Sequence, residues 1–150
     1  TFRLFFPVAP TDAGEPASVT TVPEEERKTV LLVDDDPVVR NVVSRILERR
    51  GHDVRTFENG ADAARAFRDT FQEVDLVVLD MVMPGLSGEE TFDRLREIDP
   101  EARILIATGY TRGADARRVL DAGALGILRK PFGASELWDA VSNVLEEGQG

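Results

Sequence analysis

Five polar residues follow short apolar runs of the chain, and their side chains suit chemistry on an anionic group beside a metal ion. They are Asp34, Asp35, Asp80, Thr108 and Lys130. Carboxylates brought together in a compact site repel one another and need a cation. Their hard oxygens match the preference of Mg²⁺, and a carboxylate can also act as a nucleophile. A lysine and a hydroxyl beside them can hold anionic oxygens. The set therefore predicts one polar cluster whose carboxylates share a cation.

Three of these residues also have a simpler explanation when they are taken alone. Thr108 could cap a helix, Lys130 could be a solvated loop charge, and Asp80 could begin a turn. Asp36, next to the first pair, reads as a helix cap. These explanations do not account for carboxylates from separate parts of the chain meeting at one edge of a fold.

The elements that must position these residues follow from the hydrophobic pattern. Short β-branched runs alternate with longer amphipathic stretches, which is typical of a parallel α/β sheet covered by helices on both faces. The predicted strands are Val30 to Val33, Val54 to Phe57, Val74 to Leu79, Ile104 to Ala107 and Leu125 to Leu128. Active sites of such sheets lie at the carboxyl ends of the strands. The five polar residues fall at those ends.

Helix signals separate the strands. Asp36 followed by Pro37 predicts a helix that runs to Gly51, and Ser87 with Glu90 predicts a capping box. Three further helices are marked by apolar residues at helical spacing: Ala61, Ala64, Phe67 and Phe71; Val119 and Leu120; and Leu137, Trp138, Val141, Val144 and Leu145. Five strands and five helices indicate a three-layer, doubly wound sandwich.

The composition argues against a nucleic-acid-binding or membrane-binding protein. Eighteen Lys and Arg against 28 Asp and Glu give a formal net charge of -10, which disfavours binding to nucleic acid or to an anionic membrane surface. The chain has no cysteine, and no apolar run approaches the roughly 18 residues that span a bilayer. We expect a cytoplasmic location and no membrane contact by this segment.

The motifs at the strand ends resemble the receiver domain of two-component response regulators over residues 29–147. They are Val33-Asp34-Asp35, Asp80-Met81-Val82-Met83-Pro84-Gly85, Thr108-Gly109-Tyr110 and Lys130-Pro131-Phe132. The resemblance implies the flavodoxin-like five-stranded sheet with strand order 2-1-3-4-5. It also implies a phosphoacceptor that takes its phosphoryl group from a phosphohistidine partner and promotes its own phosphorylation and dephosphorylation.

The resemblance assigns a role to each site residue. Asp80 resembles the acceptor, Lys130 the lysine that pairs with acceptor and phosphoryl oxygens, and Thr108 the hydroxyl that moves toward the transferred group. For Mg²⁺ the implied ligands are Asp35 and Asp80, with Asp34 through water and the backbone carbonyl of Val82. A cis peptide bond at Lys130-Pro131 is also implied.

Two positions depart from the best-studied members. Ile127, three residues before Lys130, is not aromatic, so the usual ring flip is not expected, and Val82 leaves the lifetime of the phosphoryl group open. Phosphorylation is expected to switch the surface around helix 4, strand 5 and helix 5. We expect the segment after Thr108 to carry much of this response, with Tyr110 as the reporting aromatic. His52, the one histidine, is expected to be an ordinary surface residue.

The segments outside the domain indicate its context. Residues 1–7, Thr-Phe-Arg-Leu-Phe-Phe-Pro, resemble the last strand of a histidine-kinase ATP-binding domain. Residues 8–28 have the composition of a flexible linker, and residues 148–150 form a short tail. The resemblance implies a hybrid histidine kinase as parent, a histidine kinase as phosphodonor, and a histidine phosphotransfer protein or kinase domain as partner. An exposed first strand would also permit a homodimer.

Two other functions compete with this interpretation. A pseudo-receiver would keep the fold as a binding module without phosphorylation, but such modules typically lose one of Asp35, Asp80, Thr108 and Lys130. An aspartate-nucleophile phosphohydrolase would place its nucleophile within residues 34–38. That alternative leaves the turn after Asp80 unexplained.

Overall fold

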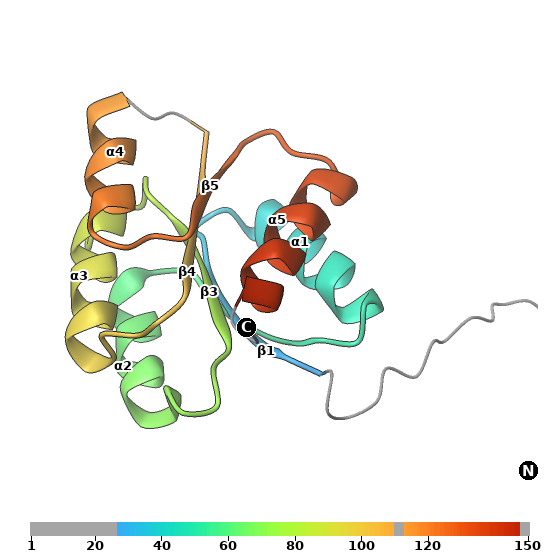
Figure 1. Ribbon diagram of the computed structural model, residues 1–150, viewed down its shortest axis with the longest axis horizontal. Helices are drawn as coiled ribbons and strands as arrows, with labels where there is room; N and C mark the ends of the chain where they lie inside the picture. The colour runs from blue at the N-terminus through green and yellow to red at the C-terminus, as the bar shows by residue number, and fades with distance from the viewer. Residues whose placement is uncertain (1–26, 110–112, 148–150) are drawn as a thin grey trace, which may run out of the picture.

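The computed structural model describes residues 27–109 and 113–147 (Figure 1). The predicted kinase strand, nearly all of the predicted linker, Tyr110 and the tail lie outside these residues. The strands are β1 (Thr29–Val33), β2 (Asp53–Phe57), β3 (Leu76–Asp80), β4 (Ile104–Thr108) and β5 (Gly126–Arg129). The helices are α1 (Pro37–Arg49), α2 (Gly60–Thr70), α3 (Gly88–Ile98), α4 (Gly113–Asp121) and α5 (Ala134–Glu147).

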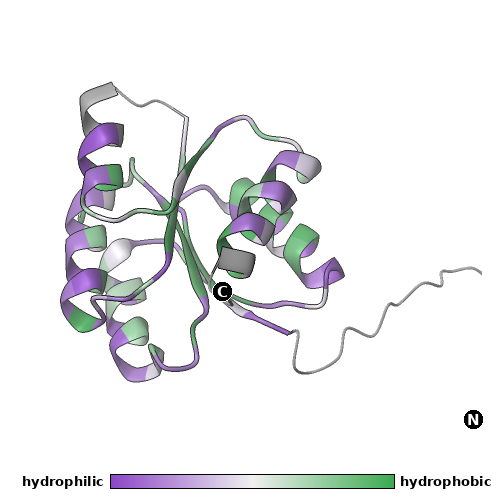
Figure 2. Cartoon of the chain, viewed as in Figure 1, coloured by the Kyte–Doolittle hydropathy of each residue, from purple (hydrophilic) through white to green (hydrophobic). Residues whose placement is uncertain are grey.

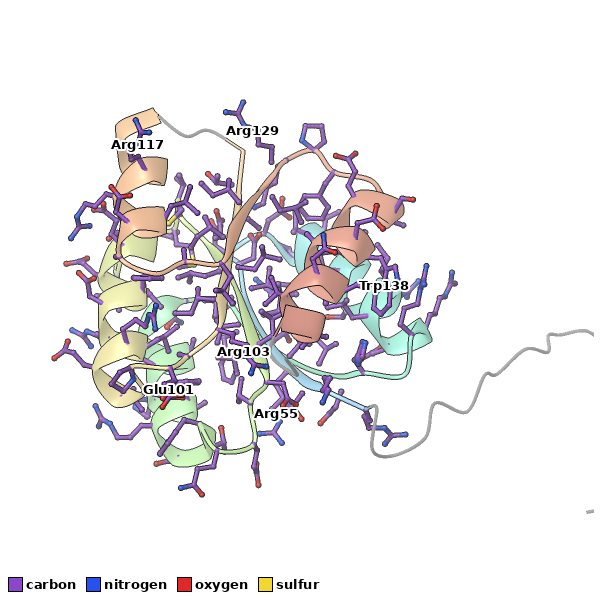
Figure 3. All side chains as sticks on the ribbon, viewed as in Figure 1. Arg55, Glu101, Arg103, Arg117, Arg129 and Trp138 are labelled. Carbon is purple, nitrogen blue, oxygen red and sulfur yellow. The ribbon has the colours of Figure 1, made fainter. Side chains whose placement is uncertain are left out.

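The five strands form one parallel sheet in the order β2-β1-β3-β4-β5. The predicted fold class and strand order are confirmed. Because all strands run in the same direction, their carboxyl ends share one edge of the sheet. Arg129, the last residue of β5, marks that edge in Figure 3, while Arg55 and Arg103 lie toward the opposite end.

Helices cover both faces of the sheet, which gives three layers (Figure 1). One core cluster joins alternate strand residues such as Leu31 and Leu79 to α2, α3 and α4, and includes Phe67 and Phe92. The other joins the intervening strand residues to α1 and α5. Figure 2 shows the hydrophobic colour concentrated along the strands and purple on the outer sides of the helices. Strands that are apolar on both sides therefore fill two cores, as parallel sheets require.

The predicted helix boundaries near the site are confirmed. The Asp36 side chain accepts a hydrogen bond from the Val38 N–H at 2.9 Å, and Pro37 is the first residue of α1. The turn after α1 contains Gly51 with a φ of 88°. The Ser87 and Glu90 pair forms the complete capping box at the start of α3. Local chemistry alone sets these helix ends.

The third strand begins later than the apolar run predicted. Val74 and Asp75 precede β3, and the Asp75 carboxylate accepts a hydrogen bond from the Thr29 N–H at 2.8 Å. Asp75 therefore ties the start of β1 to the segment before β3. At its other end β3 extends to Asp80, so the proposed acceptor is the last residue of a fully buried strand.

The expectation that His52 is an ordinary surface residue is wrong, because its exposed fraction is only 9%. Its ring stacks on Trp138 of α5, with 5.5 Å between ring centroids, and its Nδ1 accepts a hydrogen bond from the Lys28 N–H at 3.2 Å. Arg50 lies over the same Trp138 ring at 4.5 Å. Trp138 is labelled on α5 in Figure 3. The sequence around His52 gave no sign of this partner, which lies far along the chain.

Among the described residues, no helix is both long enough and apolar enough to cross a membrane.

Candidate phosphoacceptor site

The sheet brings the predicted site residues together at its carboxyl edge. Asp80 is the last residue of β3 and Thr108 the last of β4, while Asp34 directly follows β1 and Lys130 directly follows β5. The Lys130 N–H donates a hydrogen bond to the Thr108 carbonyl at 2.9 Å, which fixes the lysine backbone beside β4. Four of the five strand ends, those of β1, β3, β4 and β5, thus contribute one polar group each to the same crevice.

Three carboxylates form an acidic pocket in this crevice. Oxygen atoms of Asp34, Asp35 and Asp80 lie within 4.8 Å of one another. Asp34 and Asp80 are buried, whereas Asp35 is exposed. Carboxylate oxygens are the hard ligands that Mg²⁺ prefers, and the exposed position of Asp35 leaves room for the several waters that the ion keeps when it binds proteins. The donor set present therefore fits the predicted ion.

Lys130 lies between two of these carboxylates. Its Nζ donates to Asp34 Oδ2 at 2.6 Å and is 3.4 Å from Asp80 Oδ2. Burial by itself would lower the pKa of Lys130, but the hydrogen bond to Asp34 and the charge of Asp80 outweigh burial, so its pKa lies above the ordinary value. The lysine stays a cation and is bonded more closely to Asp34 than to Asp80.

The Asp80 carboxyl is shifted toward its protonated form. Burial raises the pKa of Asp80 to about 6; the hydrogen bond from the Val82 N–H opposes this rise, and the charge of Asp34 adds to it. The Val82 N–H donates to Asp80 Oδ1 at 3.2 Å, which leaves Oδ2 on the side of Lys130. A neighbouring cation would favour the ionised carboxylate that attack on phosphorus requires.

Asp34 is held by several neighbours. Its Oδ1 accepts from the Asp36 N–H at 2.9 Å and its Oδ2 accepts from Lys130. Both oxygens already have donors, which agrees with the expected contact to the ion through water. Arg40 was not predicted as a site residue, yet its Nη1 donates a hydrogen bond to the Asp34 backbone carbonyl at 2.6 Å. Its position in the first turn of α1, directly after the acidic loop, is the signal that could have identified it.

The turn after Asp80 has the expected form. Gly85 has a φ of 80°, a conformation that glycine adopts without strain. Val82 is 64% exposed at the mouth of the site. The expected cis bond at Lys130-Pro131 is present.

Three described residues, Thr108, Gly109 and Ile127, bear on the expected conformational response to phosphorylation. Thr108 is buried, and Ile127 is half-buried against the cluster under α2, α3 and α4. Tyr110, the expected reporter, lies outside the described residues. Its role stays a prediction.

This fold and site define a class of signalling protein. A doubly wound parallel sheet with an acidic pocket, a lysine and a hydroxyl at its carboxyl edge is the arrangement of a phosphoacceptor domain. The chain belongs to the response regulator receiver domain family, whose model matches residues 30–142. It is a receiver domain of two-component signal transduction. Receiver domains bind Mg²⁺ at an acidic pocket, and Asp34, Asp35 and Asp80 form such a pocket here.

The chain is similar in sequence or structure to individual proteins of two-component signal transduction. The chain is 36% identical over 118 residues to the chemotaxis protein CheY of Halobacterium salinarum, covering 79% of this chain and 97% of that protein. It is 32% identical over 156 residues to the sensor kinase CckA of Brucella abortus, covering 98% of this chain but only 16% of the kinase. The crystal structure of a receiver domain protein from Clostridium thermocellum superimposes with a TM-score of 0.77 at 29% identity, covering 81% of this chain and 97% of that one.

Proposed function

We propose that Asp80 is the phosphoacceptor of this receiver domain and that Lys130 and Thr108 assist the transfer. The observation that carries the proposal is the convergence of three carboxylates and Lys130 on the carboxyl edge of the sheet, with Asp80 buried at the end of β3. Asp34 shares this burial and the contact to Lys130, but both of its carboxylate oxygens already accept hydrogen bonds, one from the Asp36 N–H and one from Lys130.

The chemistry follows from these positions. A carboxylate oxygen of Asp80 attacks the phosphorus of a phosphohistidine. An acyl phosphate forms as the phosphorus–nitrogen bond breaks and its electron pair stays on the imidazole. Lys130, already 3.4 Å from Asp80, can transfer its hydrogen bond from Asp34 to the new phosphoryl oxygens. The Thr108 hydroxyl can then turn toward the same group.

Asp35 and Asp80, Asp34 through water, and the backbone carbonyl of Val82 would hold Mg²⁺ in this site. When bound, the ion supplies positive charge that offsets the repulsion between the carboxylates and the incoming phosphoryl group. The chain's own contribution is to hold Asp34 rigidly, through Lys130, the Asp36 N–H and Arg40.

An apolar groove beside the site supports docking of a helical phosphodonor. Its volume is about 500 Å³. It is lined by Val38, Val39, Val42, Val43, Gly109, Lys130, Pro131 and Phe132. Val38 and Val42 on α1 are 66% and 49% exposed, and the groove shares Lys130 with the acceptor site. We propose that the helix carrying the phosphohistidine packs here and presents its ring to Asp80.

We further propose that the parent protein is a hybrid histidine kinase located in the cytoplasm, and that a histidine phosphotransfer protein or kinase domain exchanges phosphoryl groups with Asp80. The similarity to CckA extends over 98% of this chain, whereas that to CheY covers 79%. Residues 1–7 resemble a kinase strand. Phosphorylation would then alter the surface of α4, β5 and α5. Sequencing the coding region upstream of Thr1 tests the parentage: a kinase core encoded there supports it, and its absence contradicts it.

The test of the acceptor uses acetyl phosphate and intact-protein mass spectrometry. The wild-type chain should gain one phosphoryl group when Mg²⁺ is present and none after chelation. Asp80→Asn should gain none, and Asp75→Asn, which alters a carboxylate on the opposite edge, should label like wild type. Undiminished labelling of Asp80→Asn would refute the assignment. No labelling of the wild type under any condition would favour the pseudo-receiver.

A further inference from the structure

A second groove lies between α2 and α3, on the sheet face opposite α1 and α5 (Figure 1). Its volume is about 720 Å³ and it shares no residue with the acceptor site. Four of the lining residues are apolar and are called the floor here: Ala61, Ala64, Phe71 and Ile98. The rim is charged, formed by Arg65, Arg68, Arg94 and Glu97.

The helix packing explains why the groove is open. A Cβ at Gly60 would overlap the Thr91 side chain, so the absence of a side chain at Gly60 lets the first turns of α2 and α3 approach closely. Ala61 and Ala64 then present small side chains along the groove, which leaves space between the helices. At the far end Phe71 and Ile98 are half-buried and keep part of their apolar surface accessible.

The arginines on the rim are poorly neutralised. The side chains of Arg68 and Arg94 make no hydrogen bond or ion pair with any other described residue, and both residues are exposed. Arg65 pairs with Asp62 at 3.5 Å in an exposed contact of the kind that contributes little. Three arginines and one glutamate give the lining a charge of +2 (3 − 1), which becomes +1 (2 − 1) when Asp62, the partner of Arg65, is included, in a chain whose net charge is -10. The groove is therefore a positive site on an acidic molecule.

We propose that this groove binds an acidic amphipathic helix of a partner protein. Aliphatic side chains on one face of that helix would cover Phe71 and Ile98, and carboxylates flanking them would pair with Arg68 and Arg94. A nucleic acid or an anionic membrane is a poorer occupant, because neither would cover the apolar floor as well and both would meet the negative charge of the remaining surface. The site stands apart from the acceptor chemistry and does not depend on it.

The test uses a designed peptide and the full chain. The probe is an 18-residue helical peptide with leucines one turn apart, flanked on both sides by glutamates, and the readout is the backbone amide NMR spectrum. We expect shifts confined to residues 61–71 and 94–98 and an affinity that falls as salt rises. Arg68→Glu with Arg94→Glu should weaken binding by about 10-fold or more.

The matched control is Arg45→Glu with Arg49→Glu, which makes the same change in net charge on exposed positions of α1, on the other face of the sheet. It should weaken binding less than about twofold, since long-range charge effects are screened beyond about 10 Å at 0.1 M salt. The milder pair Arg68→Gln with Arg94→Gln guards against misfolding and should give an intermediate loss.

Four results would overturn the proposal. If the two charge-reversal pairs, at Arg68 and Arg94 and at Arg45 and Arg49, weakened binding equally, the peptide would be attracted by net charge alone. If a peptide with serines in place of leucines bound equally well, the apolar floor would have no role in binding. Absence of groove shifts at millimolar peptide would exclude the site. Shifts of the same amides with protein concentration alone would identify the occupant as a second copy of this chain.

Discussion

The shorter hydrogen bond of Lys130 is to Asp34 and not to the proposed acceptor, Asp80. The Lys130 Nζ is 2.6 Å from Asp34 and 3.4 Å from Asp80. In the proposed mechanism, the same cation neutralises Asp34 before transfer and lies within reach of phosphoryl oxygens on Asp80 afterwards.

Arg40 is expected to support the metal pocket without entering it, because its guanidinium holds the backbone of Asp34 through the 2.6 Å hydrogen bond. Arg40→Met keeps much of the aliphatic stem and removes the donors. We expect a loss of about 10-fold in Mg²⁺ affinity, the size seen when outer-shell partners of metal ligands are removed. Calorimetric titration measures it, and Arg45→Met on the exposed side of the same helix should bind like wild type. Equal affinities of the two variants would contradict the role.

His52 is expected to make the protein less stable in mild acid. Burial lowers the pKa of His52 below its usual 6.5, with a further lowering by Lys28 and a smaller opposing effect of Asp75. Between the folded pKa and 6.5 the unfolded state binds more protons, so this stabilising contribution is complete above pH 6.5 and is lost as pH falls. Urea unfolding from pH 5 to 8 should show it, with the single tryptophan, Trp138, reporting by fluorescence.

His52→Gln provides the control, because glutamine keeps an acceptor for the Lys28 N–H but does not titrate. Asp80 acts with the opposite sign, since its pKa of about 6 in the folded state lies above its usual 3.8, so the folded state binds the extra proton. Comparing the two proteins at each pH cancels that contribution. An unchanged pH profile in His52→Gln would refute the role of His52.

At the scale of the elements, the close contact of α3 with the end of β3 shapes the acceptor site. Gly88, the first residue of α3, donates its N–H to the Met81 carbonyl at 3.1 Å. A Cβ at Gly88 would lie 2.3 Å from Met81 Cα and 2.6 Å from the Asp80 carbonyl oxygen. Both neighbours are backbone atoms and cannot rotate away.

Gly88→Ala is therefore expected to destabilise the fold by about 1–3 kcal/mol, as overpacking does, and to slow labelling by acetyl phosphate. Gly133→Ala is the matched control, because its Cβ would meet nothing closer than Glu136 Oε1 at 3.8 Å. Denaturant melts measure both variants. A Gly88→Ala protein as stable as Gly133→Ala would show that the helix can shift at little cost.

The two adjacent residues Asp35 and Asp36 are expected to have different roles, Asp35 as a metal ligand and Asp36 as a helix cap. Asp36 caps α1 through the Val38 N–H, whereas the Asp35 carboxylate faces the pocket. Asp36→Ala should cost about 1 kcal/mol in the free energy of unfolding and leave Mg²⁺ affinity nearly unchanged. Asp35→Ala should weaken Mg²⁺ binding and leave the free energy of unfolding nearly unchanged. Metal titrations and thermal melts on both variants test this division, which equal metal affinities would contradict.

At the scale of the whole molecule, the proposed docking groove and the proposed acceptor site lie on adjacent surfaces. Among the described residues that line the apolar groove of α1 and Pro131, Lys130 is the one that also belongs to the proposed site. Val38→Ser with Val42→Ser should slow transfer from a phosphohistidine donor by about 10-fold, because apolar contact area is lost at the interface. The rate of labelling by acetyl phosphate, which needs no docking, should change less than about twofold.

Leu125→Ser is the control for removing an exposed apolar side chain, since Leu125 is 42% exposed and lies outside the groove. It should transfer like wild type. Equal slowing with both donors would show that the valines support the site itself rather than a partner.

The sequence by itself determined the strands, the helix caps and the residues at the carboxyl edge. Apolar runs and capping signals such as Asp36 and the Ser87–Glu90 pair act over a few residues, so they can be read locally. Given parallel strands, Asp34, Asp35, Asp80, Thr108 and Lys130 had to share one edge. The sequence could not show that Lys130 bonds more closely to Asp34 or that Arg40 holds the Asp34 carbonyl. It also could not place His52 under Trp138 or open a positive groove between α2 and α3. These features depend on distances between segments far apart in the chain, and only tertiary packing sets such distances.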